Sequence, residues 1–245
     1  MLDIQKKIIL ASVVEMLTKE KASCTRTSLK RYVEFDDNDV LESIEYGIQT
    51  GVLRPEPSGY IKLLKQEYRI QEEDYYDQIK SMLGKYYNSR VSRSGDCLVA
   101  KTARKDTKIA GRWTRPDFTV VASRTFPYIR QVEFDIITFE VKRPEDCDTL
   151  AVFEALAHNS AATRSYVFFP MTEEEFEENA QSERIREECI HHGIGLVLTN
   201  DGFTLDEIVV LIESRRRALN PEKCSQFLRN VLESRELSVL TTWRQ

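Results

Sequence analysis

Two stretches of sequence are the most informative about the architecture of this chain: WTRPDFTVV at residues 113–121 and DIITFEVKR at residues 135–143. Both are short and rich in β-branched and aromatic residues, which predicts two neighbouring β-strands. Because side chains alternate between the faces of a strand, Glu140 and Lys142 lie on one face, and the apolar residues that alternate with them lie on the other. Charged groups inside such a strand need partners or a metal ion, so we predict a functional site here.

A carboxylate at the start of the first strand completes the chemistry of this site. Asp117 and Glu140 on neighbouring strands would bring two carboxylates into one coordination sphere, and hard oxygen ligands favour Mg²⁺ or Mn²⁺. The backbone carbonyl of Val141 would supply another oxygen. A metal held there would polarise a phosphodiester and lower the pKa of a bound water, while Lys142 would hold that water or stabilise negative charge. The alternative is a salt-bridged strand pair without chemistry.

These residues resemble the PD-(D/E)XK nuclease superfamily, which has the restriction-endonuclease-like fold. The resemblance covers about residues 67–200 and implies that Asp117 and Glu140 are metal ligands and that Lys142 is the catalytic lysine. The step of 23 residues from Asp117 to Glu140 is long for this family. It predicts a hairpin extension between the two strands.

The resemblance also implies acidic or polar residues on the helices that flank the two strands. The family often has a glutamate on the preceding helix, and the sequence does not choose between Glu72 and Glu73. We assign Glu73 to the metal and Glu72 to a supporting position. On the following helix, Glu154 takes a place where the family more often has glutamine, and it shares a face with His158, which we interpret as structural.

The order of elements after residue 66 predicts an α/β fold. We expect a restriction-endonuclease-like mixed sheet flanked by helices over residues 67–245. The predicted helices are at 67–88, 148–163, 172–191, 204–218 and 221–236. The predicted strands are at 96–102, 117–123, 128–134, 135–142, 165–169 and 194–198.

Residues 1–66 predict a separate domain that resembles a winged helix-turn-helix. Three helical patterns end at Gly51 and are followed by two short strands around the turn-rich sequence PEPSG. The third helix, at 36–50, carries five acidic residues and no Lys or Arg, which is a poor composition for reading a DNA groove. The domain as a whole has 10 basic and 10 acidic residues. DNA binding and protein contact therefore both stay open for it.

A basic segment, residues 101–115, leads directly into Asp117. It holds six cations and one acidic residue, a pattern that favours contact with nucleic-acid phosphates over a merely solvated loop. With Arg143, which follows the site lysine, the predicted phosphate-binding residues are Lys101, Arg104, Lys105, Lys108, Arg112, Arg115 and Arg143.

The composition of the whole chain sets wider limits. The 245 residues include 35 basic and 40 acidic side chains, a net charge of −5 that by itself argues against nucleic acid as a partner. The acidic residues concentrate at 36–50 and 172–190, away from the basic segment. No apolar run is long enough to span a bilayer, no signal peptide is recognised, and five dispersed cysteines favour a reducing compartment. We therefore expect a cytoplasmic protein without a membrane partner.

The sequence thus predicts a Mg²⁺-dependent endonuclease acting on nucleic acid, with DNA favoured. By resemblance, this architecture suggests a role in prokaryotic restriction or defence. The alternatives are a nuclease for RNA or single strands, and a non-catalytic DNA-binding or adaptor protein on an inactivated nuclease fold. Double-strand cutting usually needs two sites, so a homodimer is expected, and a regulatory protein partner would restrain the activity.

Overall fold

A computed structural model of the chain describes residues 1–20, 24–65, 67–91, 95–103, 115–218 and 220–243. The chain forms two units, Met1–Tyr75 and Tyr76–Gln245. The boundary predicted from the sequence lies earlier, at residue 66. The difference arises because residues 67–71 are not helical, and the helix expected at 67–88 begins only at Tyr76, after a short 3₁₀ helix.

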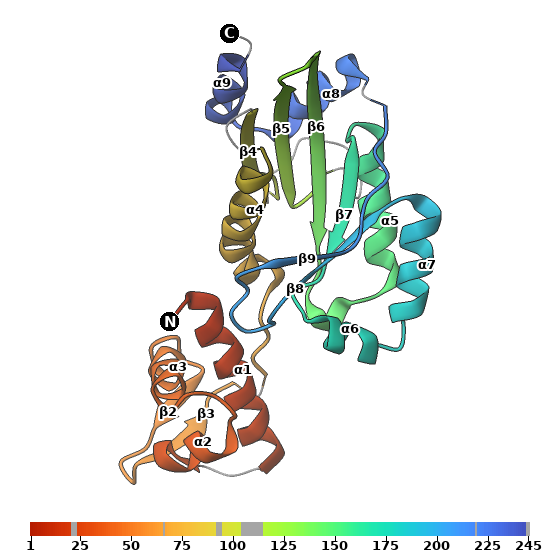
Figure 1. The fold of residues 1–245 in the computed structure, drawn as a ribbon. Helices are drawn as coiled ribbons and strands as arrows, with labels where there is room; N and C mark the ends of the chain where they lie inside the picture. The colour runs from red at the N-terminus through yellow and green to blue at the C-terminus, as the bar shows by residue number, and fades with distance from the viewer. Residues whose placement is uncertain (21–23, 66, 92–94, 104–114, 219, 244–245) are drawn as a thin grey trace. The chain divides into compact units, whose positions relative to one another are not determined.

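The first unit has the predicted order of three helices followed by a hairpin (Figure 1). Capping side chains fix the starts of the second and third helices, because Thr25 accepts from the Ser28 amide and Asp36 accepts from the Asn38 amide. The hairpin pairs antiparallel, and a two-residue strand joins its open side, giving the order β1-β3-β2. The elements are α1 (Asp3–Glu20), β1 (Cys24–Thr25), α2 (Arg26–Tyr32), α3 (Asp37–Gln49), β2 (Leu53–Pro55), β3 (Tyr60–Leu63) and η1 (Glu72–Tyr75).

The second unit is an α/β domain built on a mixed six-stranded sheet (Figure 1). The strand order is β4-β5-β6-β7-β8-β9; β6, β7 and β8 are parallel neighbours, and the remaining pairs are antiparallel. The strands are β4 (Gly95–Lys101), β5 (Phe118–Phe126), β6 (Ile129–Val141), β7 (Arg164–Phe168), β8 (Gly195–Thr199) and β9 (Ile208–Ile212). The helices are α4 (Tyr76–Val91), η3 (Pro144–Asp146), α5 (Thr149–Ala157), η4 (His158–Ser160), α6 (Glu173–Glu178), α7 (Ser182–His192), α8 (Pro221–Val231) and α9 (Ser234–Thr242).

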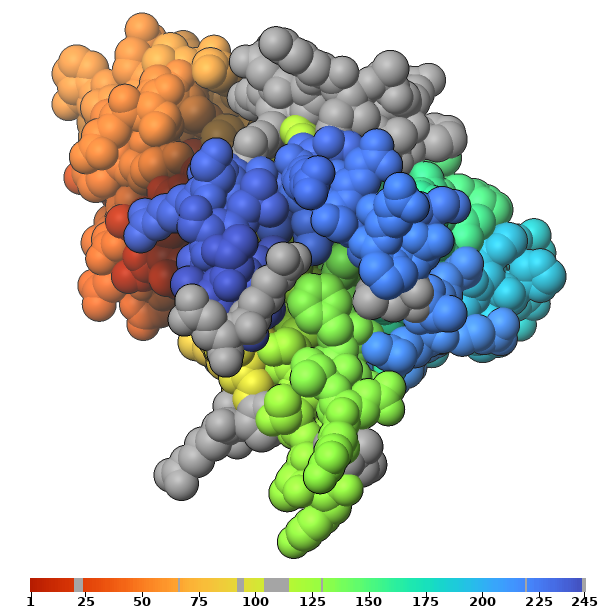
Figure 2. Space-filling view, turned by 90° about the horizontal axis from the view of Figure 1, so that it is seen from above, coloured from red at the N-terminus to blue at the C-terminus, as the bar shows by residue number. Residues whose placement is uncertain are grey.

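The two neighbouring strands predicted from the sequence form a long hairpin. β5 and β6 pair antiparallel from Phe118 opposite Phe139 to the tip, where a register shift follows Thr125. The hairpin extension predicted from the sequence is therefore present, and the two strands expected at 128–134 and 135–142 are one continuous strand. Its tip projects from the surface as a narrow green finger (Figure 2), and Tyr128 there is 97% exposed.

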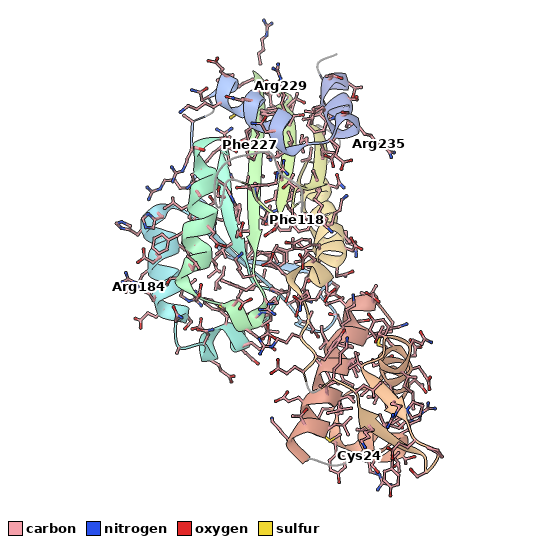
Figure 3. The ribbon with its side chains drawn as sticks, turned by 180° about the vertical axis from the view of Figure 1, so that it is seen from behind. Cys24, Phe118, Arg184, Phe227, Arg229 and Arg235 are labelled. Carbon is pink, nitrogen blue, oxygen red and sulfur yellow. The ribbon has the colours of Figure 1, made fainter. Side chains whose placement is uncertain are left out.

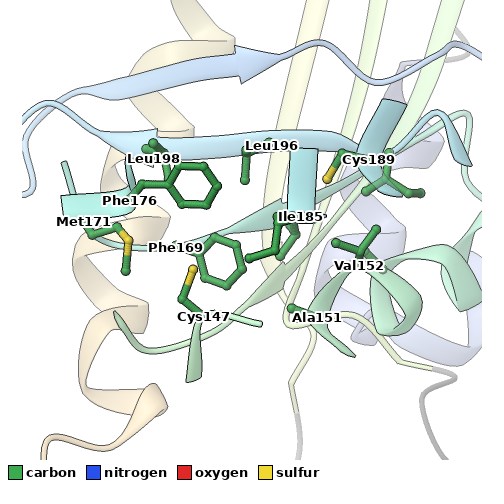
Figure 4. Packing of buried hydrophobic residues seen from close by; sticks show 13 residues of the cluster. Cys147, Ala151, Val152, Phe169, Met171, Phe176, Ile185, Cys189, Leu196 and Leu198 are labelled. Carbon is green, nitrogen blue, oxygen red and sulfur yellow. The ribbon is translucent and has the colours of Figure 1, made fainter. Parts of the chain in front are cut away.

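Each face of the sheet is covered by different helices. Helix α4 packs on one face, where Tyr87 meets the ring of Phe139. On the opposite face, α5, α6 and α7 enclose a core with β7 and β8 that includes Val167, Phe169 and Leu196 (Figure 4). Helices α8 and α9 cover the β4–β6 part of that same face, with Phe227 of α8 packed inward (Figure 3). We call these the α4 face and the α5 face.

One predicted helix is wrong. The segment expected as a helix at 204–218 contains strand β9, which pairs antiparallel with β8 from Leu196 opposite Ile212. The run IVVLI is almost wholly β-branched, which favours a strand. Moreover, β8 would otherwise leave its backbone groups on that side unpaired, and an open sheet edge of this kind is disfavoured.

Three other predicted helices are shorter than expected or divided. The helix expected at 148–163 ends at Ala157 and continues only as the short helix η4. The helix expected at 172–191 is two helices, α6 and α7, and the one expected at 221–236 is divided at Leu232 between α8 and α9. None of the described helices is long and apolar enough to cross a bilayer.

Candidate active site

The candidate site lies where β5 begins and β6 ends, on the α5 face. The pairing of Phe118 with Phe139 puts Asp117 beside Glu140 across the two strands. Glu140 lies opposite Val167 of β7, a residue of the α5-face core, so the Glu140 side chain points to that face. Both carboxylates are buried, each with 8% of its surface exposed. Two buried carboxylates thus lie beside each other, one directly before β5 and one within β6.

Lys142 lies between two glutamates that come from different elements. Its Nζ is 2.7 Å from Glu140 Oε1 and 2.7 Å from Glu154 Oε2. Glu154 is a buried residue of α5, and Asp148 caps the start of that helix by accepting from two backbone amides. The cap and the α5-face core fix α5 on the sheet, so the helix holds its carboxylate over the end of β6. We call Asp117, Glu140, Lys142 and Glu154 the acidic cluster.

Hydrogen bonds from Tyr76 and from the β6 backbone orient the Asp117 carboxylate. The Tyr76 hydroxyl donates to its Oδ1 at 2.6 Å, and the Val141 backbone amide donates to its Oδ2 at 2.8 Å. Tyr76 is the first residue of α4 and packs edge-on against Phe118 at 5.3 Å between ring centroids. The start of α4 therefore orients Asp117 from the side, and β6 orients it through its own backbone.

The charges in the acidic cluster do not balance around Glu140. Burial raises the pKa of Glu140 well above its usual range, and the neighbouring Asp117 carboxylate raises it further. Lys142 acts in the opposite direction but does not offset these two effects. A hydrogen bond with Glu154 also favours the protonated form of Glu140. An additional cation at this position would therefore be stabilised.

His158 is a buried neighbour of Glu140. It is 3% exposed, and its Nε2 lies 3.8 Å from Glu140 Oε2. Burial, the largest cause, lowers its pKa to about 4, so the ring is neutral at pH 7. Neither ring nitrogen forms a hydrogen bond within the described part of the chain.

The donor set fits Mg²⁺ or Mn²⁺ in its chemistry. Asp117 and Glu140 offer hard oxygen donors beside each other, in a site where negative charge is in excess. Within the described ranges, no group of three or more His, Cys, Asp or Glu side chains is arranged to hold a metal ion. Mg²⁺ is commonly bound through only one or two carboxylates together with waters and substrate oxygens, so a two-carboxylate site is compatible with it.

The other predicted acidic residues belong to the first unit. Glu72 and Glu73 are in η1, which belongs to the first unit, and Glu73 is exposed. Of the helix residues considered from the sequence, the structure brings Glu154 into contact with Lys142. On the side of Asp117 that faces the start of α4, the described contact is the Tyr76 hydroxyl.

The predicted phosphate-binding residues are described only in part. Arg104, Lys105, Lys108 and Arg112 lie outside the described residues, as does Trp113. The start of the basic segment adjoins Asp117, because the Thr102 and Ala103 amides donate to the Asp117 carbonyl oxygen at 2.7 and 3.0 Å. The other end, Arg115, precedes Asp117 by two residues in the sequence.

The three described cations of this set have different surroundings. Lys101 is exposed, and its Nζ lies 4.9 Å from the Tyr76 ring centroid. Arg115 donates to the Asn230 carbonyl oxygen at 2.5 Å. Arg143 forms an ion pair with Asp146 at 2.6 Å. Lys101 is therefore the most accessible described cation near Asp117.

Sequence reasoning missed the contribution of Tyr76 and understated that of His158. Nothing in the local pattern distinguishes Tyr76 from the other aromatic residues of its helix, because its role depends on a contact 41 residues along the chain. The spacing of Glu154 and His158 on one helical face was a usable signal, and both side chains do approach Glu140.

No family model and no curated protein matches the chain. Among solved structures, a protein of unknown function from Silicibacter pomeroyi is similar to 72% of this chain and 93% of its own, with a TM-score of 0.39 and 11% identity. The TM-score and the sequence identity are both low, so this neighbour assigns neither a fold family nor a function to the chain.

Proposed function

We propose that the second unit is a metal-dependent endonuclease of the PD-(D/E)XK type with a restriction-endonuclease-like fold, and that DNA is its favoured substrate. The observation that carries the proposal is the acidic cluster, in which Lys142 bridges Glu140 and Glu154 next to the buried Asp117 carboxylate. Burying charged groups is costly, and a phosphodiesterase site gives this cost a function.

Asp117 and Glu140 are the proposed metal ligands, together with the backbone carbonyl of Val141. Bound there, Mg²⁺ or Mn²⁺ would polarise the phosphodiester and lower the pKa of a bound water. The raised pKa of Glu140, caused by burial and then by Asp117, supports a cation at this position. Tyr76 and the Val141 amide keep the Asp117 carboxylate oriented before substrate arrives.

Lys142 is the proposed group that acts on the phosphate. Its ammonium is held by two carboxylates at 2.7 Å, so its direction is fixed rather than averaged over many rotamers. From this position it stabilises negative charge on the phosphate in the transition state, or holds the attacking water. Glu154 is a positioning residue in this scheme, since it acts through Lys142.

Nucleic acid would reach the site across the basic segment. Lys101 and Arg115 stand at its described ends, and the proposed interface also includes Arg143 and the cations at 104, 105, 108 and 112. Arg143 forms an ion pair with Asp146, so a phosphate ligand would compete with the Asp146 carboxylate for the Arg143 guanidinium. Contacts of this kind weaken as salt rises, so binding is expected to be sensitive to ionic strength.

The first unit is proposed as a winged-helix-like domain. The acidic residues of its α3 pair with cations of the preceding helices, including Lys6 with Glu42 and Lys30 with Asp37. This arrangement supports protein contact, including homodimerisation, more than groove reading by α3. A role in prokaryotic restriction or defence follows only from the resemblance.

One observation favours a second candidate function. Lys142, Glu140 and Glu154 already form a linked set of ion pairs, which is also the form that a retired active site would take. In that case the chain would be a non-catalytic nucleic-acid-binding or adaptor protein. An experiment that measures binding and cutting separately distinguishes the two functions.

The test incubates the full chain with supercoiled plasmid, linear duplex, single-stranded DNA and RNA, each with Mg²⁺, Mn²⁺ or EDTA. We expect cutting that requires the metal and that falls about 100-fold in Glu140→Gln and in Lys142→Ala. The matched controls are Glu145→Gln and Lys80→Ala, whose wild-type side chains are both exposed. They should cut like wild type.

Two results would contradict the proposal. If wild type and all four variants cut equally, the activity belongs to a contaminant or to another site. If wild type binds DNA in a mobility-shift assay but cuts no substrate with either metal, the non-catalytic function is correct.

A further inference from the structure

A cavity lies on the α4 face, the side of the sheet opposite the acidic cluster. Its volume is about 390 Å³, within the usual range for sites that bind small molecules. The sheet forms its floor and α4 one wall, and Glu213, which follows β9, closes another side. Arg90, Arg124 and Glu213 at its border are exposed, so the cavity opens to solvent.

The inner part of the cavity is flat and aromatic. The rings of Tyr86 and Tyr87 on α4 meet edge-on, with their centroids 5.1 Å apart. The Tyr166 ring on β7 stacks on the Phe139 ring, with an angle of 13° between the two ring planes. Ala122 on β5, which is also part of the lining, contributes only a methyl group to the floor. A small floor residue in a cavity lined by three tyrosines leaves room for a planar ring, since aromatic faces stack on any base, and we call this room the tyrosine slot.

Polar groups at this slot include both hydrogen-bond donors and acceptors. Burial raises the pKa of Tyr87 and Tyr166 well above the usual range, so both remain hydroxyls. The Tyr166 hydroxyl donates to Glu213 at 2.8 Å, whereas the Tyr87 hydroxyl forms no hydrogen bond with any residue described in the structure. A ring with amino and carbonyl groups on its edge would satisfy these groups.

The arginines of the cavity are unequally paired. Arg124 forms an ion pair with Glu133, with 2.8 Å between Nη2 and Oε2. Arg164, by contrast, donates to the Ser214 carbonyl oxygen at 2.5 Å and has no ion pair with a described carboxylate. Arg90 lies over the Tyr86 ring, with its guanidinium carbon 4.0 Å from the ring centroid, and its Nη1 is 4.0 Å from Glu213 Oε1. Two guanidinium groups thus retain donors for an anion, and their planar fork matches phosphate.

We propose that this cavity binds a nucleotide, with the base in the tyrosine slot and the phosphate on Arg90 and Arg164. The site is distinct from the proposed active site, because the odd-numbered residues of β6 face it and Glu140 faces the other side. Its occupation does not depend on the nuclease proposal. The nucleotide can be free in solution, or it can be an unpaired base that a nucleic acid extrudes into the slot.

The experiment titrates the full chain with adenosine, guanosine, cytidine and uridine 5′-monophosphates by isothermal calorimetry. EDTA is present throughout, so that metal-dependent cutting does not contribute. We expect saturable binding of at least one nucleotide with a stoichiometry of one per chain. Competition by a short duplex with one unpaired nucleotide, compared with a fully paired duplex, then distinguishes the extruded base from the free nucleotide; either source supports the cavity.

Two variants test the location of binding. Arg90→Gln removes an exposed guanidinium, and Ala122→Leu fills the slot without changing charge; each should weaken binding about ten-fold or more. Arg235→Gln on the surface of α9 (Figure 3) is the matched control and should bind like wild type. Circular dichroism verifies that each variant is folded.

Two outcomes overturn the proposal. One is the absence of binding by all four nucleotides at millimolar concentration. The other is binding that folded Arg90→Gln and Ala122→Leu leave unchanged, because the nucleotide would then lie elsewhere. Neither outcome bears on metal-dependent cutting, so failure here and failure of the nuclease proposal are separate results.

Discussion

Strand β6 carries acidic residues on both faces of the sheet, and the charged groups that surround these carboxylates differ between the two faces. Glu133 and Asp135 border the cavity on the α4 face, where Arg124 and Arg216 pair with them at 2.8 Å. Glu140, on the α5 face, shares its surroundings with two further carboxylates, and its pKa is raised. One strand therefore carries carboxylates that are compensated by arginine and one that is crowded by other carboxylates.

The difference lies in burial and in the source of the countercharge. The two arginines are exposed and reach the carboxylates from solvent, so each pair contributes little to stability. Lys142 is largely buried, and its single positive charge pairs with both Glu140 and Glu154. Crowded buried charge is a feature that folding alone does not favour, and this is why the α5 face, rather than the α4 face, is the proposed site of catalysis.

Removing the central cation should have the largest effect on stability. Lys142→Met leaves Glu140 and Glu154 buried without their shared partner, and we expect the free energy of unfolding in EDTA to fall by about 3 kcal/mol. Arg216→Gln on the α4 face should cost about 0.5 kcal/mol, since that pair is exposed. Urea denaturation measures both. Equal losses would show that the two faces do not differ as described.

Removing the hydroxyl that holds Asp117 should have the next largest effect. Tyr76→Phe deletes a buried hydrogen bond to a carboxylate, and we expect a loss of about 2 kcal/mol. Tyr166→Phe deletes a similar bond on the α4 face, but its acceptor Glu213 is exposed, so the loss should be about 0.5 kcal/mol. Thermal unfolding of the pair tests this ranking. A larger loss in Tyr166→Phe would reverse the comparison.

Neutralising one carboxylate on each face should give small changes of opposite sign. Glu140→Gln relieves the repulsion by Asp117 and the cost of burying a charge, so in EDTA the free energy of unfolding should rise by about 0.5 kcal/mol. Asp135→Asn loses the ion pair with Arg216, so the free energy of unfolding should fall by about 0.5 kcal/mol. Urea denaturation of both variants at pH 8 provides the measurement. A fall in Glu140→Gln would mean that Lys142 already compensates Glu140.

The fold was predictable where the residue pattern is strictly local. Alternation across residues 135–142 placed Glu140 and Lys142 on the face opposite Phe139, and the register of β5 with β6 agrees with it. The segment 204–218 failed because apolar β-branched residues at its centre fit either a strand or a buried helix. Pairing with β8 decided between them, and a sequence window does not contain that partner.

The residue pattern alone predicts that the carboxylates of Asp117 and Glu140 lie beside each other on a hairpin, because strand periodicity and a hairpin leave few other arrangements. What surrounds the two carboxylates depends on the tertiary structure. Tyr76 and Glu154 reach the site from two helices on opposite sides of the sheet, through contacts that depend on how each helix packs. Alternation along a strand is set by the backbone geometry of that strand, whereas packing between distant segments depends on the whole core, which no short stretch of sequence specifies.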